Sequence, residues 1–234
     1  MRIGMFAAFL ALGALGAAKD TSEIVRAVEA RYARAHTLQA RFYERYRASG
    51  QPGQSETGTV YFSKPGRMRW EYESPSTKLF LVDGTNVWLY VPADRTASRA
   101  KLKESDDWRT PLALLTGKIH LDRLCGKIDL ISAAANPDAA GDAPIDPRNV
   151  VLNCLPRSSS SADESNATFR QILFEVDPEY HLVRVVVREP GDTETEFRFG
   201  DWRENISAPE AMFHFEPPPG VSVVNAEDLA RAIH

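Results

Sequence analysis

Residues 64–73 read Lys64-Pro65-Gly66-Arg67-Met68-Arg69-Trp70-Glu71-Tyr72-Glu73, a turn followed by strict alternation of charged and apolar side chains. Because successive side chains of a strand point to opposite sides, this strand has one charged face and one apolar face. The charged face carries Arg67, Arg69, Glu71 and Glu73, and the apolar face carries Met68, Trp70 and Tyr72. Something must cover the apolar face: a second sheet, a helix or a ligand.

Short strands separated by turn residues extend from this stretch in both directions. Tight turns such as Asp83-Gly84 connect them, which is typical of antiparallel hairpins. We expect about eleven strands, and antiparallel sheets of this size close or curl. The predicted strands cover residues 38–45, 57–62, 67–73, 78–82, 86–91, 127–131, 150–155, 168–176, 181–188, 193–202 and 211–215, with 96–102 as an optional further strand and 221–224 as a last extended piece.

Two segments have helical patterns. Residues 21–36 place Ile24, Val28 and Tyr32 at helical spacing, which predicts an amphipathic helix with one apolar face. Residues 110–117 begin with Thr-Pro and end with Gly, which predicts a short helix containing Leu112, Leu114 and Leu115. So short a helix is stable only when it packs against the sheet. The sequence therefore predicts a mainly β protein in which few helices lie across a curled, incomplete barrel.

The composition argues against several functions. The 234 residues include 28 basic and 32 acidic side chains, for a formal net charge of -4, and form no basic stripe of the kind that binds nucleic acid. The sequence contains no H-E-x-x-H, G-x-S-x-G or Walker-type motif, and its five His residues are not at metal-ligand spacing. We therefore expect no enzyme, no cofactor and no metal site, although a site assembled from distant residues stays an alternative.

The N-terminus and the cysteines indicate export. Residues 1–18 have a basic start, an apolar run and small residues at the end, as a secretory signal peptide does; a buried helix is the alternative. No Cys follows the run, so we expect no lipid anchor. Cys125 and Cys154 fit an oxidising compartment, and we expect a disulfide that closes a loop of roughly 30 residues, worth about 3–4 kcal/mol.

Several motifs together resemble a known family. Phe62 to Tyr72, with the turn at Lys64-Pro65-Gly66, is similar to a strand-turn-strand of LolA-type periplasmic carriers of outer-membrane lipoproteins. Further matches follow in family order from about residue 20 to 225. They are Ser74-Pro75, Leu79-Phe80-Leu81-Val82-Asp83-Gly84, Val87-Trp88-Leu89-Tyr90-Val91-Pro92, Thr110-Pro111-Leu112-Ala113-Leu114-Leu115 and Phe213-His214-Phe215-Glu216-Pro217-Pro218-Pro219-Gly220-Val221.

The resemblance implies a single carrier domain over residues 19–234 that follows the signal peptide. Its fold would be an unclosed antiparallel half-barrel of about 11 strands with an α-helical lid. Such a monomeric periplasmic carrier takes acylated lipoproteins from an inner-membrane ABC lipoprotein exporter, shields their acyl chains, and passes them to an outer-membrane acceptor. No catalysis or cofactor is implied.

The resemblance also implies roles for particular residues. Large apolar side chains would line the acyl-chain cavity, the leucines of the short helix would belong to the lid, and Lys64 would be the latch that bonds to lid-helix carbonyls. The family usually has Arg at the latch position, so Arg67 or Arg69 could share this role. The expected cavity residues are Val60, Phe62, Met68, Trp70, Tyr72 and Phe80, and the expected lid residues are Leu112, Leu114 and Leu115.

Other interpretations stay open at this point. Met68, Trp70 and Tyr72 could be ordinary sheet core, and the first helix could be plain packing. Residues 133–147 and 158–161 form enlarged loops, and the cysteine pair is not part of the family motif. The alternative function is a periplasmic lipid- or lipoprotein-binding sensor or scaffold of the same fold with no transport role.

Overall fold

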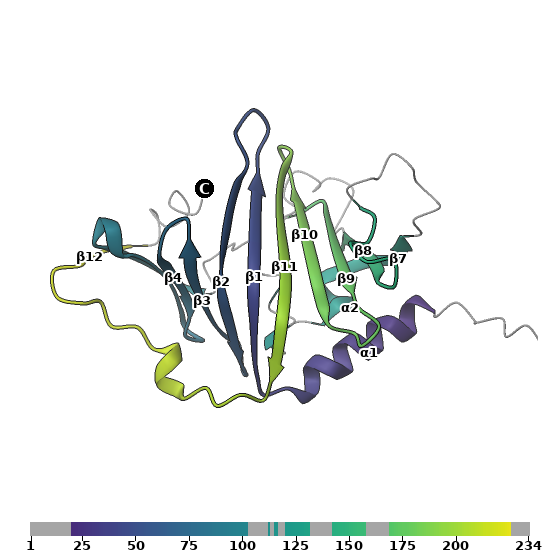
Figure 1. The fold of residues 1–234 in the computed structure, drawn as a ribbon, viewed down its shortest axis with the longest axis horizontal. Helices are drawn as coiled ribbons and strands as arrows, with labels where there is room; N and C mark the ends of the chain where they lie inside the picture. Colours follow the sequence, from purple (N-terminus) through teal and green to yellow (C-terminus); the bar gives the residue numbers. More distant parts are fainter. Residues whose placement is uncertain are drawn as a thin grey trace, which may run out of the picture.

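The structure is a computed structural model that describes residues 20–102, 112, 115–116, 120–131, 142–157 and 169–225. One 12-stranded sheet dominates it, with the strand order β12-β6-β5-β4-β3-β2-β1-β11-β10-β9-β8-β7. The sheet is strongly curved, and helix α1 runs along one side of it (Figure 1). This architecture confirms the prediction of a mainly β fold with few helices.

The elements follow the predicted order closely. The helices are α1 (Thr21–Arg34) and α2 (Leu121–Leu124), and the 3₁₀ turns are η1 (Pro92–Asp94) and η5 (Glu210–Phe213). The strands are β1 (Thr37–Arg47), β2 (Gln54–Ser63), β3 (Arg67–Ser74), β4 (Lys78–Val82), β5 (Asn86–Val91), β6 (Thr96–Lys101), β7 (Cys125–Ile131), β8 (Val150–Pro156), β9 (Gln171–Val176), β10 (Leu182–Glu189), β11 (Thr193–Glu204) and β12 (Ser222–Asn225).

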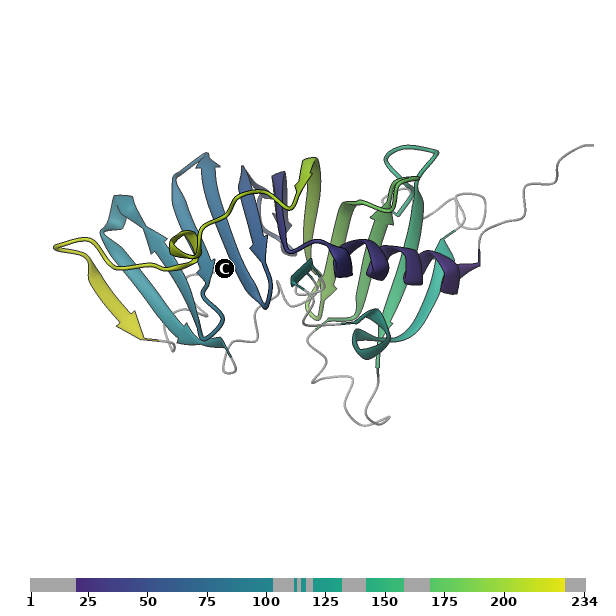
Figure 2. The ribbon, with the colours of Figure 1, turned by 90° about the horizontal axis from the view of Figure 1, so that it is seen from below.

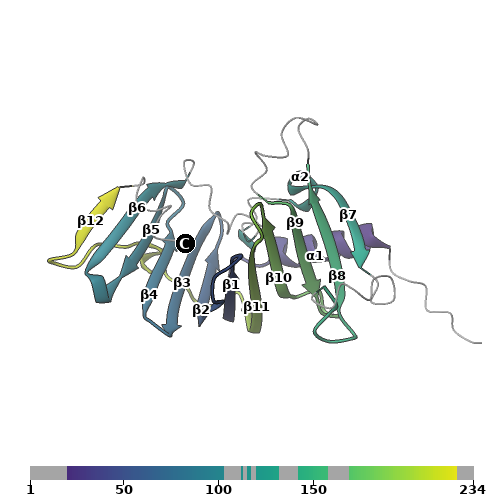
Figure 3. The same ribbon diagram turned by 90° about the horizontal axis from the view of Figure 1, so that it is seen from above.

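The sheet is an open barrel whose two edge strands are β7 and β12. Figure 3 shows these edges at opposite ends of the curved sheet. All neighbouring strands pair antiparallel except β12, which runs parallel to β6. The centre is the long pair β1–β11, where the first and last long strands of the domain meet and join its two halves.

The two faces of the sheet differ as the alternation in residues 67–73 predicts. Met68, Trp70 and Tyr72 are buried in the main core on the concave face, together with residues of α1. Arg67 and Arg69 point to the outer face, where they bond to the segment that follows β11. Seen from below, α1 lies along the half of the sheet formed by β7–β11, and the chain after β11 crosses the other half (Figure 2).

The expected strand at 211–215 is wrong. Residues Glu210–Phe213 form the 3₁₀ turn η5, which follows Pro209. This segment does not extend the sheet but packs on its outer face, where Phe215 contacts Trp88 and Tyr90 at ring-centroid distances of 5.3 and 5.2 Å. Apolar side chains on the outside of β4–β6 therefore need a cover too, and the C-terminal segment supplies it.

Strands β7 and β8 are also joined covalently. Cys125 and Cys154 form the expected disulfide, with their Cα atoms 5.4 Å apart, and both side chains are buried in the main core. Within the described part of the chain, no helix is long and apolar enough to cross a membrane.

Candidate binding site on the concave face

The six expected cavity residues lie together on three neighbouring strands. Register places Val60 opposite Trp70 and Phe62 opposite Met68 between β2 and β3, and Trp70 opposite Phe80 between β3 and β4. All six side chains are buried, and Trp70 at the centre is fully buried. The structure therefore brings Val60, Phe62, Met68, Trp70, Tyr72 and Phe80 onto one continuous apolar surface.

The same surface contains aromatic residues that the motif comparison did not single out. Phe42 of β1 packs edge-on against Trp70 and Tyr72, at ring-centroid distances of 4.8 and 5.0 Å. Phe197 and Phe199 of β11, the next strand beyond β1, also contact Trp70, at ring-centroid distances of 5.4 and 6.2 Å. The alternation of apolar and polar residues within 38–45 and 193–202 was enough to predict that Phe42, Phe197 and Phe199 lie on buried strand faces. What the sequence could not show is that β1 and β11 are neighbours.

Helix α1 lies over the β7–β11 half of the same core, and its C-terminal end reaches the edge of this apolar surface beside Lys64. Its buried side chains Ile24, Val28 and Tyr32 belong to the same core as the residues of the concave face. Of the expected lid leucines, Leu112 and Leu115 are also buried in this core, and Leu114 lies outside the described residues. Helix α1 is amphipathic and marginal by itself, so this contact is what keeps it in place.

Lys64 fastens the C-terminal end of α1. Its Nζ atom donates hydrogen bonds to the main-chain oxygens of Tyr32 and Ala33, at 2.6 and 2.8 Å. These oxygens belong to the last turn of the helix, where they lack partners within the helix and where the helix dipole favours a cation. Partial burial lowers the pKa of the Lys64 ammonium below its ordinary value.

Arg67 and Arg69, the alternative latch residues, contact a different part of the chain. Arg67 Nη1 donates to Glu210 Oε1 at 2.9 Å, and Arg69 Nη1 donates to the main-chain oxygen of Met212 at 2.9 Å. Lys64, in the turn before β3, therefore holds α1. The outward side chains Arg67 and Arg69 of β3 hold the C-terminal segment instead.

A second fastening point lies on the turn between β9 and β10. Arg31 of α1 binds the Glu204 carboxylate and the His181 ring, and its Nη1 donates to the main-chain oxygen of Glu179 at 3.0 Å. His181 Nδ1 lies 2.8 Å from Asp177 Oδ2. Asp177, Glu179 and His181 are close enough to hold a cation, but the His181 ring already contacts Asp177 and Arg31.

The same turn also holds α1 through its buried face. The Tyr32 hydroxyl accepts a hydrogen bond from the Leu182 N–H at 2.7 Å, and the Tyr32 ring packs on Trp202. Burial raises the pKa of the Tyr32 hydroxyl, so it stays protonated and neutral. Trp202 Nε1 donates to the Leu182 oxygen at 2.9 Å. Polar contacts of Arg31, the Tyr32 hydroxyl and Lys64 thus hold α1 beside its buried apolar side chains Ile24 and Val28.

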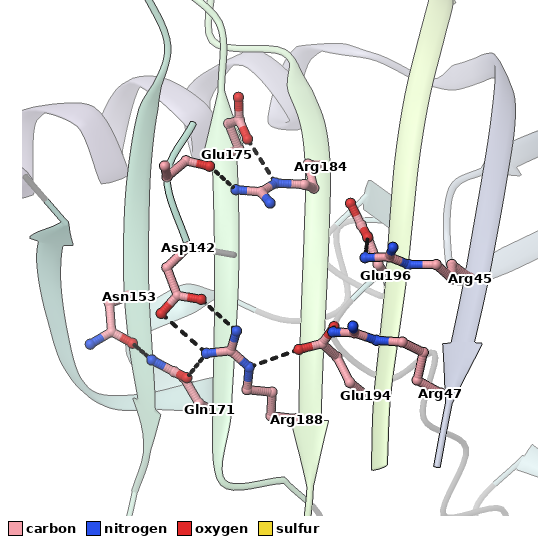
Figure 4. Close-up of polar contacts among 11 residues, drawn as sticks. Arg45, Arg47, Asp142, Asn153, Gln171, Glu175, Arg184, Arg188, Glu194 and Glu196 are labelled. Carbon is pink, nitrogen blue, oxygen red and sulfur yellow. Dashed lines mark hydrogen bonds and ion pairs between the residues drawn. The ribbon is translucent and has the colours of Figure 1, made fainter. Parts of the chain in front are cut away.

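The outer face of β8–β11 carries a polar network next to a small apolar cluster formed by Val151, Leu173 and Val186. Figure 4 shows Arg184 directed at Glu175, and Arg188 placed among Asp142, Gln171 and Glu194. Glu175 is fully buried and also accepts the N–H of Ile145 at 2.7 Å, so the loop before β8 covers this face. Sequence reasoning predicted only an enlarged loop here, because the partners of the loop come from two other strands, β9 and β10.

The amino-acid sequence was also compared with known protein families and proteins. Residues 33–129 match the family model described as the outer membrane lipoprotein carrier protein LolA. This part of the chain is similar to LolA. The resemblance that its sequence motifs indicate is therefore confirmed, and the matched LolA segment includes β1–β6, Lys64 and all six expected cavity residues.

Several carrier proteins align with most of this chain. It is 28% identical over 210 residues to the outer-membrane lipoprotein carrier protein of Xylella fastidiosa, covering 89% of this chain and 88% of the relative. The corresponding protein of Chromobacterium violaceum is 27% identical over 195 residues, covering 82% of each chain. A crystal structure of a LolA superfamily protein from Nitrosomonas europaea aligns with a TM-score of 0.44 and 11% identity, covering 85% of this chain and 99% of that one.

Proposed function

We propose that the protein is a non-catalytic periplasmic carrier that binds the acyl chains of lipoproteins on its concave face, beneath α1. The observation that carries this proposal is the pair of bonds from Lys64 to the last turn of α1, directly beside the aromatic surface of β2–β4. A helix that covers a large apolar surface and is fastened at its edges by polar contacts is suited to opening. The carrier names of its relatives support the same function.

The energetics favour acyl chains as ligands. Each CH₂ group moved from water into an apolar site contributes about 0.8 kcal/mol, so an apolar cavity offsets most of the cost of taking an acyl chain out of a membrane. Met68 and the aromatic side chains around Trp70 offer adaptable apolar walls once α1 moves. Helix α1 covers the adjoining β7–β11 part of the same core, so moving it would extend the apolar surface that a ligand can reach. Release then follows when α1 returns and its polar contacts re-form.

The finer steps of the proposal rest on the family resemblance. We expect residues 1–18 to be a cleaved signal peptide and residues 19–234 to form one carrier domain. The carrier would receive lipoproteins from an inner-membrane ABC exporter and deliver them to an outer-membrane acceptor. No step in this cycle requires bond chemistry in the carrier, because transfer between binding sites needs only differences in affinity.

A reconstituted transfer assay tests the proposal. Vesicles carrying a purified acylated lipoprotein are incubated with the exported protein, the soluble fraction is isolated, and bound lipoprotein is quantified by mass spectrometry. A carrier yields a soluble complex that then releases its lipoprotein to acceptor vesicles. A protein that binds acylated material but never releases it would be the lipid-binding sensor or scaffold, and a protein that extracts nothing would contradict both functions.

A further inference from the structure

Helix α1 and the C-terminal segment, residues 207–225, meet at one place in the molecule. Figure 1 shows both at the lower end of the central pair β1–β11, from which α1 extends along one half of the sheet and the C-terminal segment along the other. Helix α1 packs on the concave core, whereas the C-terminal segment packs on the outer face. The residues Glu204, Asn205 and Ile206, here called the joint, lie between them.

The joint holds the end of α1 through two side chains. Glu204 pairs with Arg31, which lies in the last turn of α1. Asn205 Oδ1 accepts a hydrogen bond from the His36 N–H at 2.9 Å. His36 lies between the end of α1 and the start of β1, so it belongs to the short connection about which α1 would turn. The joint therefore restrains both the helix and its hinge.

Main-chain contacts fix this hinge from two sides. The Asn205 N–H donates to the Thr37 oxygen at 2.7 Å, and the Thr37 hydroxyl donates to the Ile206 oxygen at 2.7 Å. On the other side, the Lys64 N–H donates to the His36 oxygen at 3.0 Å. Asn205 has a φ of 53°, a left-handed conformation that Asn adopts more readily than most residues. Because Asn205 bonds to the hinge directly, a shift of the chain that follows it disturbs the hinge.

The C-terminal segment is attached to the outer face at a few separate points. Arg67 bonds to Glu210, and its guanidinium lies 5.4 Å from the centre of the Phe213 ring. Further along, Phe215 packs against Trp88. A cavity of about 520 Å³ lies between η5 and the β4–β5 turn at residues 83–86, so the segment is not packed tightly along its whole length. Such an attachment can open while the sheet stays folded.

Arg67 provides a second connection between the C-terminal segment and α1. Its Nη2 donates to Ser63 Oγ at 3.2 Å and to the Lys64 oxygen at 3.4 Å. Lys64 in turn holds the last turn of α1. The Arg67 guanidinium thus links Glu210 on the outer face to the residue that fastens α1 on the concave face. Two sets of contacts, the joint and Arg67, therefore connect the two elements across the sheet.

We propose that the C-terminal segment acts as a strap that keeps α1 closed: docked on the outer face it holds the joint, and its release frees the hinge of α1. The two states of the segment then bias one movable element, which is what coupling between separate faces of a protein requires. The inference rests on the proposed function only for the purpose of the movement, which is to extend the apolar surface that an acyl chain can reach. The coupling itself is a property of the ligand-free protein.

Hydrogen-exchange mass spectrometry of the ligand-free exported protein tests the coupling. The segment variant, Phe213→Ala with Phe215→Ala, removes apolar attachments and leaves the joint intact. The joint variant, Asn205→Gly, removes a side-chain acceptor, and glycine keeps the left-handed conformation without strain. The control, Val151→Ala with Leu173→Ala, removes two buried apolar side chains from the outer-face cluster on β8 and β9. Thermal unfolding checks that each variant is folded.

The segment variant should speed amide exchange in residues 207–225 and, at the same time, in residues 30–37 at the end of α1. The expected increase in residues 30–37 is about fivefold or more, the effect of roughly one lost hydrogen bond. The joint variant should speed exchange in residues 30–37 by a similar factor, and the control should not. Faster exchange in residues 207–225 with unchanged exchange in residues 30–37, or an equal increase in the control, would overturn the inference.

Coupling between two equilibria is reciprocal, which supplies a second test. Lys64→Leu, which removes two bonds to the last turn of α1, should also speed exchange in the C-terminal segment. Unchanged exchange in that segment would contradict the coupling. The lipoprotein transfer assay is a separate measurement, so a protein that extracts no lipoprotein but shows coupled exchange would lose the carrier function and keep this inference.

Discussion

The Nζ atom of Lys64 lies 2.6 Å from the main-chain oxygen of Tyr32, and so connects the turn before β3 to the last turn of α1. The same helical residue, Tyr32, contributes its ring to the core and its hydroxyl to Leu182. One end of the covering helix is therefore held from two different strands of the sheet. The strength of these contacts sets how readily the concave face opens.

Replacing Lys64 should loosen α1 without unfolding the sheet. In Lys64→Leu two carbonyl oxygens lose their charged donor, which costs about 1–3 kcal/mol and corresponds to roughly tenfold or more faster amide exchange in α1. Hydrogen-exchange mass spectrometry measures this directly. Lys64→Arg should keep most of the protection, because a guanidinium also donates to carbonyls.

Lys127→Leu is a matched control for that experiment, since Lys127 is an exposed lysine of β7 that pairs with Asp129. It should leave exchange in α1 unchanged. Unaltered exchange and unaltered lipoprotein release in Lys64→Leu would show that Lys64 is only a surface lysine.

Removing the disulfide should lower global stability. The bond joins residues 29 positions apart, so the chain-entropy estimate for Cys125→Ser with Cys154→Ser is a loss of about 3–4 kcal/mol. Chemical denaturation of the oxidised protein and of the double variant gives the difference. A loss well below 1 kcal/mol would mean that β7 and β8 hold their register through packing alone.

The outer-face ion pair between Arg184 and Glu175 should matter for stability but not for ligand binding. Arg184→Met leaves the fully buried Glu175 carboxylate without its cation, which costs about 3–5 kcal/mol. Arg148→Met serves as the comparison, because Arg148 forms an exposed pair with Asp146 that solvent screens and that contributes little to stability. Urea midpoints measure both, and an equal effect of the two variants would contradict the assigned burial.

Acid should destabilise the protein partly through Glu194. Burial by itself would raise the pKa of the Glu194 carboxyl, but hydrogen bonds from Arg188 and Arg47 outweigh it and hold the pKa below its ordinary value of 4.5. A carboxyl with a depressed pKa in the folded state stabilises the fold above its unfolded pKa. That contribution is lost as the pH falls through the folded pKa.

Stability measured by denaturation from pH 7 down to pH 3 should therefore fall, with most of the Glu194 contribution lost below about pH 4.5. Glu194→Gln should be less stable than wild type at pH 7 and should show a shallower decline on acidification. Parallel curves for the two proteins would refute the assignment of this carboxyl.

Local patterns in the sequence predicted the elements well. Alternation in residues 67–73 correctly separates the inward Trp70 from the outward Arg69, and helical spacing correctly places Ile24, Val28 and Tyr32 on the buried side of α1. These features depend on neighbours a few residues away, so periodicity alone reveals them. The expected strand at 211–215 failed because apolar residues there pack on the outside of the sheet as a turn.

Features that join distant segments were not predictable from the sequence. The pairing of Glu44 with Tyr72, and of Arg31 with Glu204, depends on which strands become neighbours. The network between Arg184, Glu175 and the loop before β8 depends likewise on three-dimensional placement. The family resemblance supplied Lys64 as a latch candidate, but the identity of the helix it contacts, α1, came from the structure.

The position of a bound acyl chain tests the central claim most directly. A diacylated lipopeptide with a photoreactive group near the end of one acyl chain is bound to the wild-type protein, irradiated, and its crosslinks are located by mass spectrometry. The account predicts crosslinks on the inward residues of β2–β4 around Trp70 and on the buried face of α1. Crosslinks confined to the outer face, such as the segment containing Phe213 and Phe215, would contradict it.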